Sequence, residues 1–375
     1  MQGEVQINQH MLTWAIARAG FKVDEFVARF PKVAAWLNDT KKPTIKQLEE
    51  FSHRVHVPFG YLLLDQPPTE SINIPFFRTN MADIGRLNLN VYDTIISLQD
   101  RQEWLSDYLK DKDFDKLTFI SKYDLNTSFD AIVNDIRSTL DLHESWACDF
   151  KKHEEALDCL TKAIESIGVI VVFNSIVENN TSRGIPVEEC RGFVLVDDYA
   201  PFMFINSADG KAAQLFTMIH ELAHLWIGES AAFDNSKLLP ADDPIELLCD
   251  KVAAEFLVPT KAFKELWEHR QDLEYVARHF KVSKIVIARR ALDLGVITRG
   301  EFFKFYEEYT QYIKYLKDKQ TGGGDFYATA KKRISLSFAA HVNQAVKENL
   351  LLYKQAYKLT GLKGETYQKF ISKQF

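Results

Sequence analysis

The stretch FTMIHELAHLWIG, residues 216–228, places three ionisable side chains within an otherwise apolar run. His220 and His224 are four residues apart, so an α-helix would turn both imidazoles toward one point, and zinc binds such nitrogens readily. Glu221 directly follows the first histidine and would lie about 100° around the helix axis from it. The pattern allows two interpretations, a metal site that does chemistry or a polar accident on an apolar helix.

The residues around the histidines favour the metal site. A chain with ten histidines can contain His-x-x-x-His by chance. Here, however, apolar residues recur at three- and four-residue steps, at Phe216, Ile219, Ala223 and Ile227. Such a helix can bury one stripe while its histidines face a cleft. Gly228 is a typical residue for ending it.

A catalytic zinc needs a third protein ligand and one open position for water. Candidates lie in the helical run PIELLCDKVAAEFLVP, residues 244–259. Glu246 and Asp250 are four residues apart and share a face, so one can bind the metal while the other hydrogen-bonds the far nitrogen of an imidazole ligand. Glu255 lies about 180° around the helix from Glu246 and should face elsewhere.

The spacing of apolar residues along the sequence predicts an α+β fold that is mostly helical. Helical patterns occupy the chain to about residue 64 and again from about 90 to 166. Short β-branched and aromatic runs bounded by Gly, Asn, Asp and Pro then indicate strands at 169–177, 191–198 and 201–208. We therefore expect a small sheet directly before the histidine helix.

Residues 1–64 are predicted to form a degenerate helical domain. Thr44 is a candidate N-cap for a helix in which Leu48, Phe51 and Val55 recur. The segment resembles the end of Cro/C1-type helix-turn-helix domains in the order of these pieces: Trp36, Pro43-Thr44, Leu48, Val57-Pro58 and Leu62 to Leu64. Only PKVAA separates Phe30 from Trp36, which leaves little helix for a DNA major groove. A docking or dimerisation module is favoured over DNA binding.

The remainder divides into three predicted regions. Residues 65–135 combine a linker with three prolines, DQPPTESINIPFFRTN at 65–80, with a helical region. Residues 136–300 form the metal domain and include a helix-turn-helix pattern at 273–298, with Ser283 as a candidate cap. In that pattern Val286, Ile287 and Leu294 are expected on the buried side, and Lys284, Arg289 and Arg290 on the outside. Residues 301–375 form a basic helical region.

Charge and composition exclude several protein classes. The net charge is −6, but residues 281–375 carry 18 Lys/Arg against 8 Asp/Glu, so attraction to an acidic partner belongs to the last quarter. The longest apolar runs fall far below the roughly 18 residues that a membrane span needs, and the N-terminus lacks a secretory pattern. Four cysteines without close pairs fit reduced thiols: Cys148, Cys159, Cys190 and Cys249. We therefore expect a cytoplasmic protein without membrane contact.

The two helical motifs together resemble the ImmA/IrrE family of bacterial metallopeptidases. FTxxHELAHxxxG is followed, 22 residues after His224, by ExxCDxxAAxFLVP. Glu246 matches the family's ligand glutamate, Asp250 stands at its Asn/Asp position, and Cys249 replaces the common alanine. Further phrases such as APFMFIN and FKVSKIVIARRALDLGVI match on either side, so the resemblance covers nearly the whole chain.

The resemblance implies a zincin-like core and a zinc endopeptidase. One Zn²⁺ per chain would be held by His220, His224 and Glu246, with Glu221 as the base and Asp250 hydrogen-bonded to a ligand imidazole. Characterised relatives cut a helix-turn-helix repressor encoded nearby. The implied partner is therefore a small helix-turn-helix repressor or antitoxin-like protein in a stress, mobile-element or toxin–antitoxin circuit.

Substrate contacts and a second function class stay open at the level of sequence. The strand around FMFIN is a candidate edge for an extended substrate, with Phe204, Asn206 and Tyr199 as binding residues. Tyr199, His279 and Arg289 all remain candidates for stabilising an oxyanion. The alternative function is a DNA-binding regulator or toxin–antitoxin component that uses 1–64 or 273–298, with a structural or vestigial zinc site, and a homodimer is a candidate assembly. Glu221 favours the enzyme, because a structural site needs ligands but no base.

Overall fold

The computed structural model describes residues 4–68, 89–228, 231–233, 243–317 and 326–375. These residues form two compact units, one containing the described residues up to 92 and the other the described residues from 93 onward. Most of the predicted proline-rich linker, residues 69–80, lies outside the described residues. Among the helices that the structure describes, none combines the length and the hydropathy that a membrane span requires.

The N-terminal unit is a small helical domain. Its elements are α1 (Gln9–Arg18), α2 (Val23–Arg29), α3 (Lys32–Leu37), α4 (Ile45–Val55) and the 3-10 helix η1 (Phe59–Leu63). Thr44 caps α4 as predicted, because its hydroxyl accepts from the Gln47 amide while the Gln47 side chain accepts from the Thr44 amide. The helix between Phe30 and Trp36 is short, as expected: α3 has six residues. Its apolar side closes a core around Phe26, Trp36 and Phe51.

The second unit is built on a four-stranded sheet of order β1-β5-β4-β6. Its strands are β1 (Ile170–Asn174), β4 (Gly192–Leu195), β5 (Phe202–Asn206) and β6 (Ala231–Phe233). β1 and β5 are parallel, whereas β4 is antiparallel to both of its neighbours. A separate hairpin pairs β2 (Ile176–Val177) with β3 (Asn180–Gly184). The strands predicted before the histidine helix are therefore confirmed.

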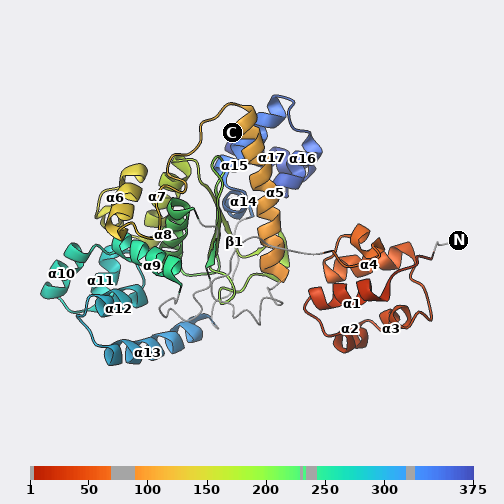
Figure 1. Ribbon diagram of the computed structural model, residues 1–375, viewed down its shortest axis with the longest axis horizontal. Helices are drawn as coiled ribbons and strands as arrows, with labels where there is room; N and C mark the ends of the chain where they lie inside the picture. Colours follow the sequence, from red (N-terminus) through yellow and green to blue (C-terminus); the bar gives the residue numbers. More distant parts are fainter. Residues whose placement is uncertain (1–3, 69–88, 229–230, 234–242, 318–325) are drawn as a thin grey trace. The chain divides into compact units, whose positions relative to one another are not determined.

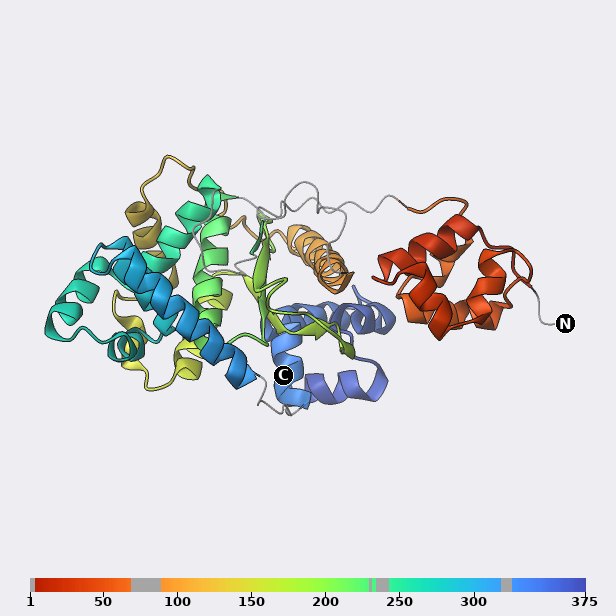
Figure 2. The ribbon, with the colours of Figure 1, turned by 90° about the horizontal axis from the view of Figure 1, so that it is seen from below.

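Helices cover both faces of this sheet, which explains why β1 and β5 are buried along their whole length. The surrounding elements are α5 (Leu89–Asp111), α6 (Phe129–Leu140), η3 (Trp146–Asp149), α7 (His153–Ser166), α8 (Lys211–Ile227), α14 (Phe326–Ile334), α15 (Leu336–Lys347), α16 (Tyr353–Thr360) and α17 (Gly364–Gln374). In Figures 1 and 2, α7 and α8 lie on one face, and α5, α14 and α15 on the other. The fold is thus α+β and mostly helical, as predicted.

The histidine helix α8 ends where the sequence predicted. Gly228 adopts a left-handed conformation with φ +83°, and its amide donates to the carbonyl of His224 at 2.8 Å. The loop before α6 satisfies two further carbonyls at this end, because the amides of Ser121 and Tyr123 donate to Leu225 and Trp226, each at 3.0 Å. The C-terminal end of the helix is therefore fixed within the second unit.

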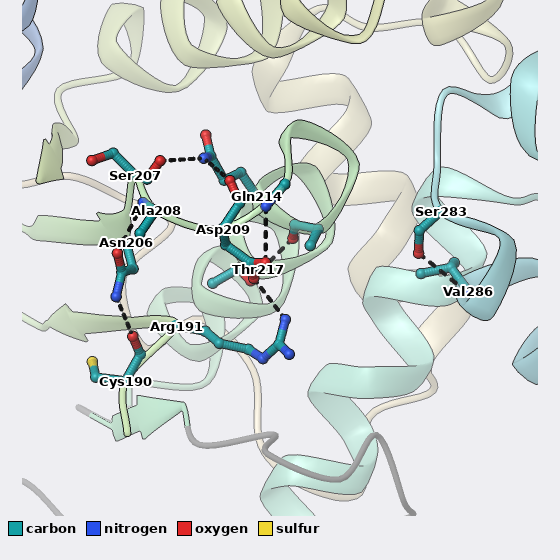
Figure 3. Close-up of polar contacts among 12 residues, drawn as sticks. Cys190, Arg191, Asn206, Ser207, Ala208, Asp209, Gln214, Thr217, Ser283 and Val286 are labelled. Atoms are coloured by element: carbon teal, nitrogen blue, oxygen red, sulfur yellow. Dashed lines mark hydrogen bonds and ion pairs between the residues drawn. The ribbon is translucent and has the colours of Figure 1, made fainter. Parts of the chain in front are cut away.

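The remaining helices follow α8 along the chain and include the helix-turn-helix pattern. They are α9 (Pro244–Leu257), α10 (Thr260–His269), α11 (Leu273–Phe280), α12 (Lys284–Asp293) and α13 (Arg299–Lys317). Ser283 caps α12 as expected, because its hydroxyl accepts from the Val286 amide (Figure 3).

Of the three basic residues expected on the outside of α12, Arg290 is wrongly placed, whereas the side chains of Lys284 and Arg289 are 34% and 29% exposed. Arg290 is only 7% exposed and its guanidinium faces the junction of α9 and α10. Lys284 pairs with Glu274 at 2.9 Å, and Arg289 pairs with Asp293 at 2.9 Å. Helical periodicity placed Arg290 outside because the partner that buries it lies 35 residues away in the sequence.

Candidate metal centre

Two packed helices, α8 and α9, supply the side chains of the centre. His220 and His224 stand one turn apart on α8, and Glu246 stands in the first turn of α9. Pro244 begins α9, and the Asp243 carboxylate accepts from the amides of the next residues, which fixes this start. The cap therefore determines that Glu246 points from a helix N-terminus toward α8.

The candidate ligand atoms of the three residues lie close enough together to hold one metal ion. The Nε2 atoms of His220 and His224 are 3.2 Å apart. One oxygen of Glu246 lies 3.3 Å from Nε2 of His220, and the other lies 3.3 Å from Nε2 of His224. Tetrahedral zinc with bonds of about 2.0–2.1 Å separates its ligand atoms by about 3.3–3.4 Å. The donor set and its geometry thus fit zinc with three protein ligands.

A hydrogen bond orients the first imidazole. Nδ1 of His220 lies 3.0 Å from Oδ1 of Asp250, one helical turn beyond Glu246 on α9. This is the arrangement that the sequence predicted for the two acids four residues apart, one toward the ligand atoms and one on the far nitrogen. Such partners fix the tautomer and the ring orientation of a ligand histidine.

The electrostatics of the cluster suit a cation. Burial alone would lower the pKa of His220, but hydrogen bonds to Asp250 and Glu246 outweigh it and raise the pKa to about 10. Burial lowers the pKa of His224. Burial would raise the pKa of Glu246, but hydrogen bonds from both histidines hold it well below its usual range. The two carboxylates that face the imidazoles therefore favour positive charge at this cluster, and a divalent ion would supply it.

Glu221 is buried beside the ligands without a hydrogen-bond partner. Its side chain is fully buried, and neither carboxylate oxygen is hydrogen-bonded. Burial raises its pKa well above the usual range of a glutamate. Buried polar groups in native proteins are nearly always satisfied, and perturbed carboxylates gather at functional sites. A carboxylate in this position would be able to exchange a proton with a group held at the ligands, a capacity that a purely structural metal site does not need.

The sheet touches α8 at Glu221 through a glycine. A Cβ on Gly192 would lie 2.6 Å from the Thr217 methyl and 3.5 Å from Cγ of Glu221. The first strand position of β4 therefore packs directly against the face of α8 that carries Thr217 and Glu221. Gly192 and Thr217 were not among the predicted site residues, although an isolated glycine within a strand pattern is a signal for close backbone approach.

A polar network fixes this end of β4 to the start of α8 (Figure 3). The Asn206 amide donates to the carbonyls of Ile185 at 2.9 Å and Cys190 at 2.8 Å, and its oxygen accepts from the Ala208 amide at 3.0 Å. Arg191 pairs with Asp209 at 2.6 Å. The network therefore holds the backbone around Gly192 in place.

The predicted substrate contacts on and near β5 need correction. β5 is an inner strand between β1 and β4, so it offers no free edge for an extended substrate. Phe204 is fully buried and stacks on Phe193, with ring centroids 4.9 Å apart. Asn206 is also fully buried, and its amide is used within the network. A local strand pattern does not reveal the order of strands in a sheet, which explains the error.

The candidates for oxyanion stabilisation are not drawn together at this centre. Tyr199 follows β4 at the end opposite to Gly192, and its ring lies near the ammonium groups of Lys110 and Lys116. Arg289 pairs with Asp293 on its own helix. His279 on α11 packs against the neighbouring Phe280 ring. Of the predicted site residues, the structure thus brings together the two histidines, Glu221, Glu246 and Asp250.

Comparison with protein families supports this picture for one part of the chain. Residues 165–292 match the model of the IrrE N-terminal-like domain, Peptidase_M78. The matched segment contains all of the residues at the centre. Residues 334–373 match a second model, a domain of unknown function (DUF8813), and neither match includes the N-terminal unit. No curated protein matches the chain.

Proposed function

We propose that this chain is a zinc-dependent endopeptidase. The observation that carries the proposal is the pairing of a three-ligand cluster with a buried, unpartnered carboxylate, Glu221. Structural zinc sites are closed by four protein ligands, whereas catalytic sites use three and keep one position open. The match of residues 165–292 to a peptidase family supports the same conclusion.

In this proposal the ligands, Glu221 and Asp250 have separate roles in peptide hydrolysis. Zinc bound by His220, His224 and Glu246 would polarise the peptide carbonyl and acidify a water molecule. Glu221 accepts the proton of the attacking water and then donates it to the leaving amine. Asp250 keeps the imidazole of His220 in the orientation that binding requires.

We further propose that the substrate is a small helix-turn-helix repressor or antitoxin-like protein. Support comes from the resemblance to ImmA/IrrE peptidases and from the matched peptidase domain. The alternative, a DNA-binding regulator with a structural zinc site, leaves Glu221 without a role. It also lacks support from α12, whose three basic side chains are engaged in pairs or buried contacts.

Metal analysis and cleavage test the proposal. The purified protein should contain close to one zinc per chain, and His220→Ala should lose it. Zinc that persists in His220→Ala would disprove the ligand assignment. Cleavage is then followed by mass spectrometry, with a small helix-turn-helix repressor encoded beside this chain as substrate.

Glu221→Gln separates chemistry from binding. This variant should keep zinc and lose cleavage by about 10²–10⁴-fold, the usual contribution of a general base. Glu268→Gln, which alters an exposed glutamate on α10, is the matched control and should cleave like the wild type. Full activity of Glu221→Gln would remove Glu221 from its role. Zinc binding without cleavage of any such repressor would favour the regulator instead.

A further inference from the structure

Arg290 of α12 connects the helix-turn-helix pattern to the metal-ligand helix α9. Its guanidinium forms an ion pair with Glu255, in the last turn of α9. The same group donates to the Val258 carbonyl at 3.0 Å and to the Thr260 hydroxyl at 2.8 Å. Arg290 thus contacts the end of α9, its C-cap and the first residue of α10.

A second arginine holds the same end of α9 from another side. Nη2 of Arg137, on α6, donates to the carbonyls of Glu255 and Phe256, each at 3.1 Å. The last carbonyls of a helix lack partners within the helix, and positive charge is favourable at that end. The two guanidinium groups therefore satisfy three carbonyls there, those of Glu255, Phe256 and Val258.

The clamped end and the metal end of α9 belong to one rigid element. Glu246 and Glu255 are nine residues apart, so they lie on opposite faces and about 13.5 Å apart along the axis. With side-chain atoms about 5–6 Å from the axis, a rotation of α9 by about 10° would move the Glu246 carboxylate by about 1 Å. Functional constellations tolerate only about 0.5 Å of such displacement.

We propose that α12 braces α9 and that Arg290 is a positioning residue for the ligand Glu246. The proposal rests on the metal centre of the proposed function. In this proposal the helix pair α11–α12 has a role within the peptidase domain. The buried Arg290 of α12 sets the rotation of α9, the helix that presents Glu246 and Asp250. The competing explanation is that the Arg290–Glu255 pair only stabilises the fold.

The experiment compares Arg290→Met with Arg289→Met in the full-length protein. Both changes remove a paired arginine from α12, but the ion pair of Arg289 is with Asp293 on the same helix. Zinc affinity is measured by competition with a chromophoric chelator, and coordination geometry by the visible spectrum of the Co²⁺-loaded protein. Arg290→Met should bind zinc at least about tenfold more weakly, as loss of outer partners does elsewhere, and should alter the Co²⁺ spectrum. Arg289→Met should do neither.

A double variant separates positioning from stability. Arg290→Met alone leaves the partly buried carboxylate of Glu255 without its cation, whereas Arg290→Met with Glu255→Leu removes both charges and should recover thermal stability. Its zinc affinity should stay low, because the contacts to Val258 and Thr260 remain lost. Recovery of zinc affinity together with stability would overturn the proposal, as would wild-type affinity in Arg290→Met.

Two further results keep the inference distinct from the proposed function. If Arg290→Met does not fold, Thr260→Val removes the hydroxyl that accepts from Arg290 and donates to Glu255, and it should still weaken zinc binding measurably. Unchanged binding would refute the brace. A wild-type protein that binds zinc but cleaves nothing would refute the peptidase and leave the brace intact. Cleavage by the wild-type protein, together with unchanged zinc affinity in Arg290→Met, would refute the brace and leave the peptidase intact.

Discussion

Replacing Gly192 by alanine should force β4 away from α8 beside Glu221. The added Cβ would lie 2.6 Å from the Thr217 methyl and 2.9 Å from the Phe204 carbonyl oxygen. Ordinary contacts begin at 3.4 Å, so the methyl would have to retreat by about 0.8 Å. Thr217 cannot swing aside cheaply, because it is β-branched and its hydroxyl donates to the Ala213 carbonyl at 3.1 Å. The backbone of α8 must move instead.

The expected cost follows from overpacking. Inserting a methyl into a well-packed interior costs about 1–3 kcal/mol of unfolding free energy. For a domain of this size, that lowers the melting temperature by several degrees. Because Glu221 is one turn from Thr217 on the same face, it moves with the helix, and a displacement of about 1 Å can reduce a reaction rate by about 10²-fold.

The assay combines thermal unfolding with the cleavage rate of the proposed repressor substrate. Gly184→Ala is the matched control, because Gly184 lies on β3 away from α8 and no atom lies within 4 Å of the added Cβ. Adding Thr217→Ser to Gly192→Ala removes the closest contact and should recover part of both losses. Gly192→Ala with wild-type unfolding and cleavage would refute the close-packing argument.

Three other outcomes follow from the contacts. Asp250→Ala should weaken zinc binding by about 10–100-fold because His220 loses the acceptor on its far nitrogen, and Asp250→Asn, which keeps an acceptor, should weaken it less. Burial raises the pKa of Tyr367 to about 12, so its stabilising contribution is present below about pH 10 and is lost as pH rises through 12. Tyr367→Phe should therefore abolish that alkaline loss in denaturant unfolding, whereas Tyr275→Phe, at an exposed tyrosine, should not. Finally, duplex DNA should show no salt-sensitive gel shift, and a shift that Lys284→Ala abolishes would contradict the paired state of that lysine.

Local patterns predicted the elements that place the metal ligands. The spacing of His220 and His224 depends only on helical geometry, and Gly228 ends the helix because of its own backbone freedom. The opposite faces of Glu246 and Glu255 on α9 likewise follow from nine residues of regular helix. These properties are determined within one element and can be read from neighbouring residues.

Contacts between distant segments could not be predicted in this way. β5 was expected at an edge, but two strands flank it, and no local signal in FMFIN encodes that order. Arg290 was expected outside, but its partners Glu255 and Thr260 belong to segments 30 or more residues earlier. Asn206 was expected at a substrate, but it ties together backbone that only the folded sheet brings near.

The sequence by itself therefore determined which side chains can hold a metal and which helix faces present them, because both depend on chemistry and helical period. Only the tertiary structure decided how those helices are held. The packing of Gly192 against Thr217 and the guanidinium groups at the end of α9 arise from long-range contacts. Such contacts depend on the packing of elements far apart in the chain, and the spacing of residues within either segment does not indicate that packing.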